Sequence, residues 1–251
     1  MVITVAVQKG GTAKTTTAAV LAQAGTHKGA HVLAIDLDPQ GNLSFTLGAR
    51  TSAGSGNSYR LLTGEPAEKQ IQGTEQGIDI IAADWNLSAI TSGRGSARRL
   101  QDAIEPIKNI YDLVIIDTPP TAGELQYNAL QAADRLIIPL QADAYNMQSL
   151  YQIHDTARQI QKSNSQLQIA GLLLTQYDGR SLLARQMQRT IINTAAEMSI
   201  PYLGTIRAAV AIKEAAALQK SLYKYAPKCK PAADYMDVFN YITDNRYTQK
   251  T

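Results

Sequence analysis

The sequence is poor in cysteine, in large aromatic residues and in excess charge of either sign. Its 251 residues include one cysteine, Cys229, two phenylalanines and one tryptophan, and its formal net charge is +3. A single cysteine cannot form an internal disulfide or a Cys-x-x-Cys metal motif, which is typical of a protein from a reducing compartment. Because the net charge is small, the position of the basic residues says more about a polyanionic partner than their number does.

Long apolar runs are also missing. The segment Met1–Val7 lacks the charged head and apolar core of a secretory signal, and no run reaches the ~18 apolar residues that a membrane-spanning helix needs. We therefore expect a cytoplasmic protein. Hydrophobic residues make up 45% of the chain, enough for one sizeable core, so a single domain over residues 1–251 is predicted.

Short runs rich in Val, Ile and Leu recur along the chain, with amphipathic segments between them. Strands that are covered on both faces lose the polar alternation of a half-exposed sheet, so such runs are predicted to be buried parallel strands. These runs are Ile3–Val7, Val32–Ile35, Ile78–Ala82, Leu113–Ile116, Leu136–Leu140 and Ile169–Leu174. The Gly/Ser-rich segment Ala49–Ser58 is predicted to be a surface loop.

Helices are predicted between these strands from apolar residues at helical spacing. The predicted helices and their apolar faces are Lys14–Lys28 with Ala18, Leu21, Ala22 and Gly25, Ser181–Met198 with Leu183, Met187 and Ile191, and Ala232–Asn245 with Tyr235, Val238, Phe239 and Ile242. Alternating strands and helices indicate an α/β fold, with a doubly wound, mostly parallel sheet flanked by helices. Ligands bind such sheets at the carboxyl ends of the strands.

A candidate phosphate loop follows the first predicted strand directly. Its glycines allow backbone N–H groups to face an anion, and the helix that follows directs its positive dipole end to the same place. Lys14 is predicted to reach the β- and γ-phosphates, and the Thr15 hydroxyl to bind magnesium. The loop residues predicted to bind nucleotide are Lys9, Gly10, Gly11, Thr12, Ala13, Lys14, Thr15 and Thr16.

The loop departs from the strict pattern GxxxxGK[ST] at two positions. Gln8 stands in place of the first glycine and Ala13 in place of the last. The alternative is a glycine-containing turn with an incidental lysine.

Three aspartates stand at the ends of two other predicted strands. Asp36 and Asp38 end the second strand and alternate to the same side, and Asp117 ends the strand at Leu113–Ile116 before two prolines. Carboxylates there can hold the shell of Mg²⁺ and orient an attacking water. The alternative is that Asp36 and Asp38 form a turn or cap a helix.

Together these segments resemble the deviant Walker A ATPases of the ParA/MinD family. The likeness rests on Lys9-Gly-Gly-x-x-Lys14-Thr15, on Asp36-x-Asp-Pro-Gln-Gly-Asn42 and on Asp117-x-Pro-Pro120. It extends over nearly the whole chain, through Leu174-Thr-Gln-Tyr-Asp178 and the segment 210–235, where it is similar to small ParA proteins.

The resemblance implies a role for several residues. Lys9 would be the signature lysine that reaches the partner's nucleotide in an ATP-bound homodimer, and Asp38 the residue needed for hydrolysis. Asp36 and Asp117 would be outer-shell magnesium carboxylates. The residues expected near the adenine are Thr175, Gln176 and Arg207.

Two departures from the family bear on these roles. Ala13 replaces a usual glycine and adds a Cβ at a tight turn. The segment 207–209 is Arg-Ala-Ala where many relatives have Pro-Arg-Asn, which leaves the adenine contacts of that loop open.

DNA binding without sequence preference is predicted from basic residues near the C-terminus. Six basic residues and one acid lie between Ile200 and Pro231. Lys213 and Lys220, seven apart, are expected to share a helix face, and Arg185 and Arg189, four apart, are expected to lie opposite the apolar face of their helix. These four are the candidate DNA-binding residues, and a merely solvated face is the alternative.

Membrane binding and operator binding are not expected. The last predicted helix carries acids on its polar face, which anionic lipid would repel, so we expect it to pack on the core. The first strand begins at Val2, which leaves no room for an operator-reading helix-turn-helix before it.

The sequence therefore predicts a cytoplasmic, nucleoid-associated DNA-partitioning ATPase that uses ATP/ADP and Mg²⁺. It would hydrolyse ATP slowly until a ParB-like partner stimulates it. The alternatives are a relative that positions a protein cargo, a MinD-like protein, and a P-loop ligase that phosphorylates a small acid.

Overall fold

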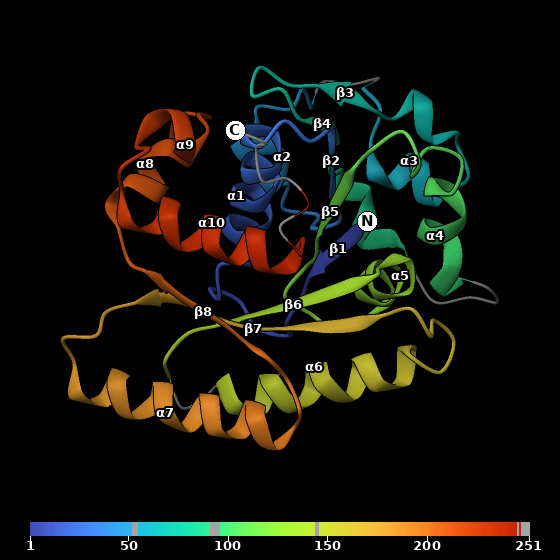
Figure 1. The fold of residues 1–251 in the computed structure, drawn as a ribbon. Coiled ribbons are helices and arrows are strands. Elements are labelled where there is room, and N and C mark those ends of the chain that lie inside the picture. The colour runs from blue at the N-terminus through green and yellow to red at the C-terminus, as the bar shows by residue number, and fades with distance from the viewer. Residues whose placement is uncertain (52–54, 91–95, 144–145, 245, 247–251) are drawn as a thin grey trace.

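The computed structural model describes residues 1–51, 55–90, 96–143, 146–244 and 246, and is built around one eight-stranded sheet (Figure 1). The strand order is β3-β4-β2-β5-β1-β6-β7-β8, and all neighbours are parallel except the pair β3 and β4. The strands are β1 Val2–Val5, β2 Val32–Asp36, β3 Gln72–Gly73, β4 Asp79–Ile81, β5 Leu113–Asp117, β6 Arg135–Leu140, β7 Gln168–Tyr177 and β8 Tyr202–Arg207.

Helices cover both faces of this sheet. They are α1 Lys14–His27, α2 Asn42–Leu47, α3 Ser58–Leu62, α4 Arg99–Ile104, α5 Glu124–Ala132, α6 Asn146–Ile160, α7 Leu182–Glu197, α8 Val210–Ala217, α9 Leu222–Tyr225 and α10 Lys230–Ile242. Short 3₁₀ turns lie at Ala67–Lys69, Trp85–Ala89 and Ser96–Arg98. Buried side chains of α1, α2 and α8 to α10 pack on one face, and those of α3 to α7 on the other (Figure 1).

The central strands are buried on both faces. Consecutive residues of β2, such as Ala34 and Ile35, belong to core clusters on opposite faces of the sheet. This follows because successive side chains of a strand point to opposite sides. This arrangement explains why these strands are continuous apolar runs in the sequence, and it confirms the predicted α/β fold class.

The predicted strands are all present, with shifted ends. β1 ends at Val5, two residues before the predicted end, and β7 continues to Tyr177, three residues beyond it. The edge strands β3 and β8 were not predicted. β3 has only two residues, and β8 is partly exposed and contains Gly204 and Thr205, so neither forms a continuous buried apolar run.

The first and last helices pack as predicted. α1 approaches the sheet closely at Gly25, where an added Cβ would lie 2.9 Å from a Val32 methyl carbon. All four predicted apolar residues of α10 are buried in the core, from Tyr235 to Ile242. In the part of the chain that the structure describes, no helix is both long and apolar enough to cross a membrane.

Two predictions about the C-terminal helices are wrong. Leu183 is 66% exposed, because the buried residues of α7 lie in its second half, at Ile191, Thr194 and Ala195. Lys213 and Lys220 do not share a helix, because α8 ends at Ala217.

The end of α8 is a Schellman motif. Gln219 takes a left-handed conformation with φ of 52°, and the Lys220 N–H donates to the Ala215 carbonyl across 2.9 Å. No glycine marks this end, so the sequence pattern gave no sign of it.

The loop predicted at Ala49–Ser58 ends one residue earlier, because Ser58 is the first residue of α3 and Asn57 caps that helix. Residues 52–54 of this segment lie outside the described residues.

Candidate nucleotide site

The predicted site residues meet at the carboxyl ends of three adjacent strands. In the parallel register, Asp117 at the end of β5 lies beside Val5 of β1 and beside Asp36 at the end of β2. The phosphate loop, residues 8–14, leaves β1 at the same edge and leads into α1. The sheet therefore brings together the loop and two of the predicted carboxylates.

The phosphate loop turns through two residues with positive φ. Gly11 has φ of 78°, and Ala13 has φ of 65° and ψ of 32°, which is the left-handed region. The Ala13 carbonyl accepts the first hydrogen bond of α1, from the Thr17 N–H at 2.9 Å. Ala13 therefore stands where a glycine would be free of strain, as the departure from the family pattern led us to expect.

Lys14 lies within this loop, and its side chain is buried. Its ammonium donates to the Lys9 carbonyl across 2.7 Å, which folds the side chain back along the loop. Burial lowers the pKa of Lys14, while the negative charges of Asp117 and Asp38 oppose that change. A cation held beside two carboxylates in a nearly dry site is placed to meet an anion, as predicted for a phosphate-binding lysine.

Asp36 organises the turn after β2. One of its oxygens accepts from the Asp38 N–H at 3.1 Å, and the other accepts from both the backbone N–H and the hydroxyl of Ser44 at 2.8 Å. Burial raises the pKa of Asp36 to about 6, although these hydrogen bonds limit the rise. The alternative reading of Asp36 as a turn-forming residue thus holds locally, and it does not exclude an outer-shell role.

Asp117 is fully buried, and its two oxygens differ in their contacts. Oδ1 accepts from the Thr118 N–H at 3.0 Å, whereas Oδ2 has no hydrogen-bond partner within the described residues. Burial and the charge of Asp36 raise the pKa of Asp117, and the Thr15 hydroxyl and the charge of Lys14 oppose the rise. An unsatisfied buried oxygen next to Thr15 fits the shell of a cation.

The magnesium ion implied by this loop would depend on the nucleotide. The described residues contain no cluster of three or more His, Cys, Asp or Glu side chains able to hold a metal ion. Thr15 and Asp117 would therefore hold the ion together with phosphate oxygens, which suits Mg²⁺.

Asp38 follows Asp36 on the turn into α2. It is almost completely buried, its side chain accepts from the Gln40 N–H at 3.0 Å, and its carbonyl accepts from the Gly41 N–H at 2.9 Å. The turn places Asp38 close enough to Lys14 for its charge to act on that ammonium.

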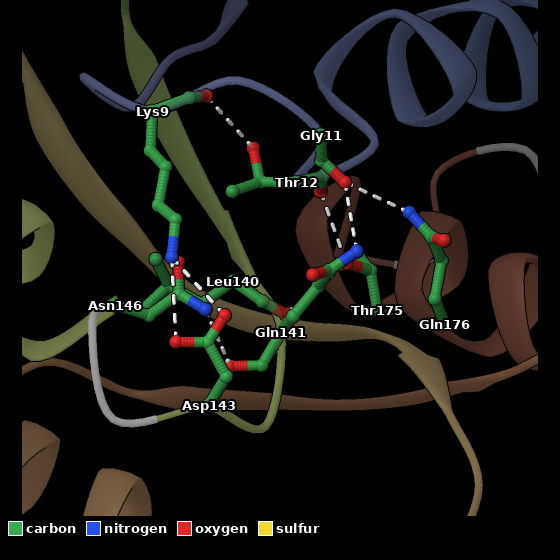
Figure 2. Close-up of polar contacts among 9 residues, drawn as sticks. All are labelled: Lys9, Gly11, Thr12, Leu140, Gln141, Asp143, Asn146, Thr175 and Gln176. Carbon is green, nitrogen blue, oxygen red and sulfur yellow. Dashed lines mark hydrogen bonds and ion pairs between the residues drawn. The ribbon is translucent and has the colours of Figure 1, made fainter.

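Lys9 extends away from the phosphate loop toward the segment after β6. Its ammonium lies 3.1 Å from Oδ2 of Asp143, and both side chains are partly exposed (Figure 2). Asp143 was not predicted, because this carboxylate lies 134 positions from the lysine that it contacts.

Side chains from the ends of β6 and β7 bind the outer side of the phosphate loop (Figure 2). The amides of Gln141 and Gln176 both donate to the Gly11 carbonyl, at 2.8 and 2.9 Å. The Thr175 hydroxyl lies 3.0 Å from the Thr12 carbonyl and 3.1 Å from the Leu140 carbonyl. Thr175 and Gln176 were predicted from the resemblance, whereas Gln141 was not.

A cavity of about 330 Å³ continues from the loop toward α8 and α10. Its lining includes Ala13, Thr16, Thr175, Gln176, Arg207 and Tyr235. A cavity of this size, open to the phosphate loop at one end, suits a nucleoside. The predicted adenine-side residues therefore do line one pocket.

Arg207 is held at this pocket by Asp234 of α10. One Asp234 oxygen accepts from the backbone N–H and the Nε of Arg207, at 3.0 and 2.9 Å, and the other pairs with Nη2. The ion pair ties the segment after β8 to α10. Asp234 was not predicted as a site residue.

The four candidate DNA-binding residues lie on two faces of the molecule. Arg185 and Arg189 are on α7, whereas Lys213 and Lys220 are on and after α8, across the sheet (Figure 1). Arg185 donates to the Gly179 carbonyl, and Lys213 lines the cavity beside the phosphate loop. The structure therefore does not join these four residues into one patch.

Comparisons with known proteins agree with this geometry. A family model described as an AAA domain matches residues 1–169. The chain is 35% identical to the chromosome-partitioning ATPase Soj of Thermus thermophilus, over 93% of this chain and 91% of that protein. It is 36% identical to the chromosome partitioning protein ParA of Caulobacter vibrioides, over 94% and 91%.

A solved structure has the same fold at a similar level of identity. It is a crystal structure described as cobyrinic acid a,c-diamide synthase from Mycobacterium smegmatis with bound ADP and magnesium, 30% identical, with a TM-score of 0.81 over 95% of this chain and 92% of that one. Over most of its length the chain shares its sequence with chromosome-partitioning ATPases, and it belongs to the ParA family of P-loop ATPases.

Proposed function

We propose that this ATPase is a nucleotide-switched partitioning protein. ATP closes two copies face to face, the closed dimer binds DNA without sequence preference, and hydrolysis reopens it. The observation that carries this proposal is the position of Lys9: it leaves the phosphate loop at the nucleotide edge and ends in a partly exposed ion pair. A cation in such a pair can exchange its carboxylate for the γ-phosphate of a facing subunit at little cost.

Different residues of the site would bind the phosphates, the nucleoside and Mg²⁺. The loop N–H groups and Lys14 bind the β- and γ-phosphates, and the nucleoside lies in the cavity beside Thr175 and Gln176. Thr15 would bind Mg²⁺, with Asp36 and Asp117 in its outer shell, and the ion would neutralise phosphate charge. Asp38 would orient the attacking water.

A switch of this kind needs ATP to favour one state over the other. Only ATP carries the phosphate that Lys9 can reach across the interface, so ATP binds the closed dimer better than ADP does. The described site offers no arginine aimed at the phosphate loop, since Arg207 is paired with Asp234. A slow basal rate, raised by a ParB-like partner with a basic segment, follows from that arrangement.

The names of the relatives support a DNA cargo. The Thermus and Caulobacter proteins are both named for chromosome partitioning. On this chain, the basic residues between Ile200 and Pro231 supply charge for phosphate contacts, which would place the ATP-bound protein on the nucleoid in the cytoplasm. A protein cargo moved by the same switch is the main alternative, and capture of a ParB-like partner distinguishes the two.

The test uses mass and DNA retention together. Wild type and Lys9→Ala are compared with ATP, ADP and no nucleotide by sedimentation, and on immobilised DNA of random sequence. We expect a dimer, and retention on DNA, only for wild type with ATP. A mass independent of nucleotide, or equal retention of all samples, rejects the proposal.

A small-molecule ligase is the second candidate, and one observation favours it. The Mycobacterium smegmatis structure is described as a diamide synthase, an enzyme that makes amides from carboxylic acids. Such an enzyme phosphorylates its acid and has no use for a lysine aimed at a partner's nucleotide. ATP turnover that requires cobyrinic acid and an amide-nitrogen donor, and ignores DNA, would favour the ligase.

A further inference from the structure

Two glutamine side chains from different strands converge on one carbonyl of the phosphate loop. Gln141 follows β6 and Gln176 lies near the end of β7, and their amides donate to the Gly11 carbonyl at 2.8 and 2.9 Å (Figure 2). A carbonyl oxygen has two lone pairs, so it can accept both hydrogen bonds at once. The Gly11 carbonyl is therefore held from two sides.

The peptide that carries this carbonyl also carries the Thr12 N–H. In a planar trans peptide the C=O and the N–H point in opposite directions, so the position of one fixes the direction of the other. Within the described residues, the N–H groups of Thr12 and Ala13 donate to no protein acceptor. Two adjacent N–H groups without a partner, on the loop that opens into the nucleoside cavity, are available to an anion.

We propose that Gln141 and Gln176 are positioning residues of the phosphate loop. They hold the Gly11 carbonyl outward, and this holds the Thr12 N–H in the direction of the bound phosphates. The inference rests on the proposed function, in which residues 9–16 bind the phosphates of ATP.

The next peptide of the loop is held in the same way. The Thr12 carbonyl lies 3.0 Å from the Thr175 hydroxyl, and the peptide behind that carbonyl carries the Ala13 N–H. Thr175 is buried in β7, and its single hydroxyl proton is shared between the Thr12 carbonyl and the Leu140 carbonyl at 3.1 Å, so it holds the loop less firmly than the two amides do. Two successive N–H groups are thus directed by side chains of β6 and β7.

Gln176 makes its contact with the loop from a strained backbone conformation. Gln176 has φ of 52°, in the left-handed region, which is strained for a residue other than glycine. This backbone conformation accompanies a side chain that lies against the phosphate loop. Gln141 is anchored in turn, because its carbonyl accepts from the buried Asn146 amide at 3.0 Å.

Because both amides act on one oxygen, the two contacts are partly redundant. Loss of one leaves the other to hold the peptide, whereas loss of both frees it to turn. The consequence should appear only with ligands that carry phosphates. Adenosine would bind in the cavity without contacting the loop N–H groups. Its affinity should therefore not depend on the orientation of the peptide between Gly11 and Thr12.

The test replaces the amides by methionine, which has similar length and neither a donor nor a charge. Gln141→Met, Gln176→Met and the double variant are titrated with ATP, ADP and adenosine, and Gln159→Met, at an exposed position on α6, is the control. One hydrogen bond is worth about fivefold in affinity. Because the two contacts are partly redundant, we expect at most about threefold weaker ATP binding for each single variant and about tenfold or more for the double variant. Gln141 does not line the cavity, so adenosine affinity should stay within about twofold for Gln141→Met. Gln176 does line it, so for Gln176→Met and the double variant the loss of ATP affinity is compared with the loss of adenosine affinity in the same variant, and the loss for ATP should be the larger.

Two results would overturn the inference. One is ATP affinity of the double variant equal to that of wild type. The other is an equal loss for ATP and adenosine, which would mean that the glutamines act on the cavity or on the fold and not on the phosphate-binding peptide. Thermal unfolding without nucleotide checks the fold, and if the double methionine variant is unfolded, the double alanine variant undergoes the same comparison.

Lys14→Ala separates this inference from the proposed function. If Lys14→Ala keeps full ATP affinity, the assignment of the phosphate loop fails. If Lys14→Ala loses ATP binding while the double glutamine variant keeps it, the loop assignment stands and the positioning role fails.

Discussion

The ammonium of Lys9 and the carboxylate of Asp143 form an ion pair of 3.1 Å within one subunit (Figure 2). In the proposed dimer this lysine leaves its own subunit for the partner's triphosphate, so the pair must open before the dimer can close. The intramolecular contact therefore competes with dimerisation.

Asp143→Asn should favour the ATP-bound dimer. Partly exposed ion pairs contribute about 0.2–1 kcal/mol, so removal of this one should lower the dimer dissociation constant by up to about fivefold. Sedimentation with ATP over a range of protein concentrations measures the change. Asp155→Asn, at an exposed position on α6, is the control, and weaker dimerisation of Asp143→Asn would contradict the competition.

Ala13→Gly should stabilise the chain. Ala13 is left-handed, with φ of 65°, and the Cβ of an L-residue costs roughly 1–2 kcal/mol there, which exceeds the entropy that glycine adds to the unfolded state. We expect a net gain of about 1 kcal/mol, or about 2–4 °C in Tm for a chain of this size. Ala196→Gly, exposed near the end of α7, should lower Tm, and a lower Tm for Ala13→Gly would show that the loop relies on the Cβ.

The central half of the fold could be predicted because burial on both faces leaves a simple pattern. β1, β2 and β5 are continuous apolar runs, and parallel strands end at the same edge of a sheet, so the pattern alone predicts that Asp36 and Asp117 lie together. The edge strand β8 was not predicted, because Gly204 and Thr205 interrupt its apolar residues.

The rest of the site depends on contacts between segments distant in the sequence. Gln141, Asp143 and Asp234 belong to no local motif, and each meets its partner only because the sheet and α10 bring separate segments together. The error at Lys220 has a local cause. Helical spacing was extended past Ala217, and a left-handed Gln219 ends the helix without the glycine that usually marks such an end.

Lys220→Ala with Lys224→Ala should weaken DNA binding and its dependence on salt. Both lysines are exposed, and they line one groove with Tyr225 and a single acid, Glu75. They belong to the segment between Ile200 and Pro231, where basic residues outnumber acids. Loss of two phosphate contacts should reduce the slope of log affinity against log salt by about 2. Retention of the ATP-bound protein at several salt concentrations gives the slope.

The control for this pair is Lys69→Ala with Lys162→Ala, which removes two exposed lysines elsewhere. Arg185→Ala with Arg189→Ala tests the α7 face separately. If the slope is unchanged for the Lys220 and Lys224 variant and reduced for the Arg185 and Arg189 variant, the DNA-binding surface lies on the α7 face of the sheet instead.

Asp234→Asn should weaken nucleoside binding rather than phosphate binding. Asp234 holds both the backbone and the guanidinium of Arg207, and Arg207 lines the nucleoside cavity. Hydrogen bonds between charged groups contribute about 1.5–3 kcal/mol when sheltered, and this pair is partly exposed, so we expect a loss of about fivefold. Arg207 lines the cavity and not the phosphate loop, so ATP and adenosine should lose affinity by the same factor, unlike Gln141→Met, which should affect ATP alone. Asp102→Asn, at an exposed position on α4, is the control. A loss confined to ATP would show that Asp234 acts through the phosphate loop instead.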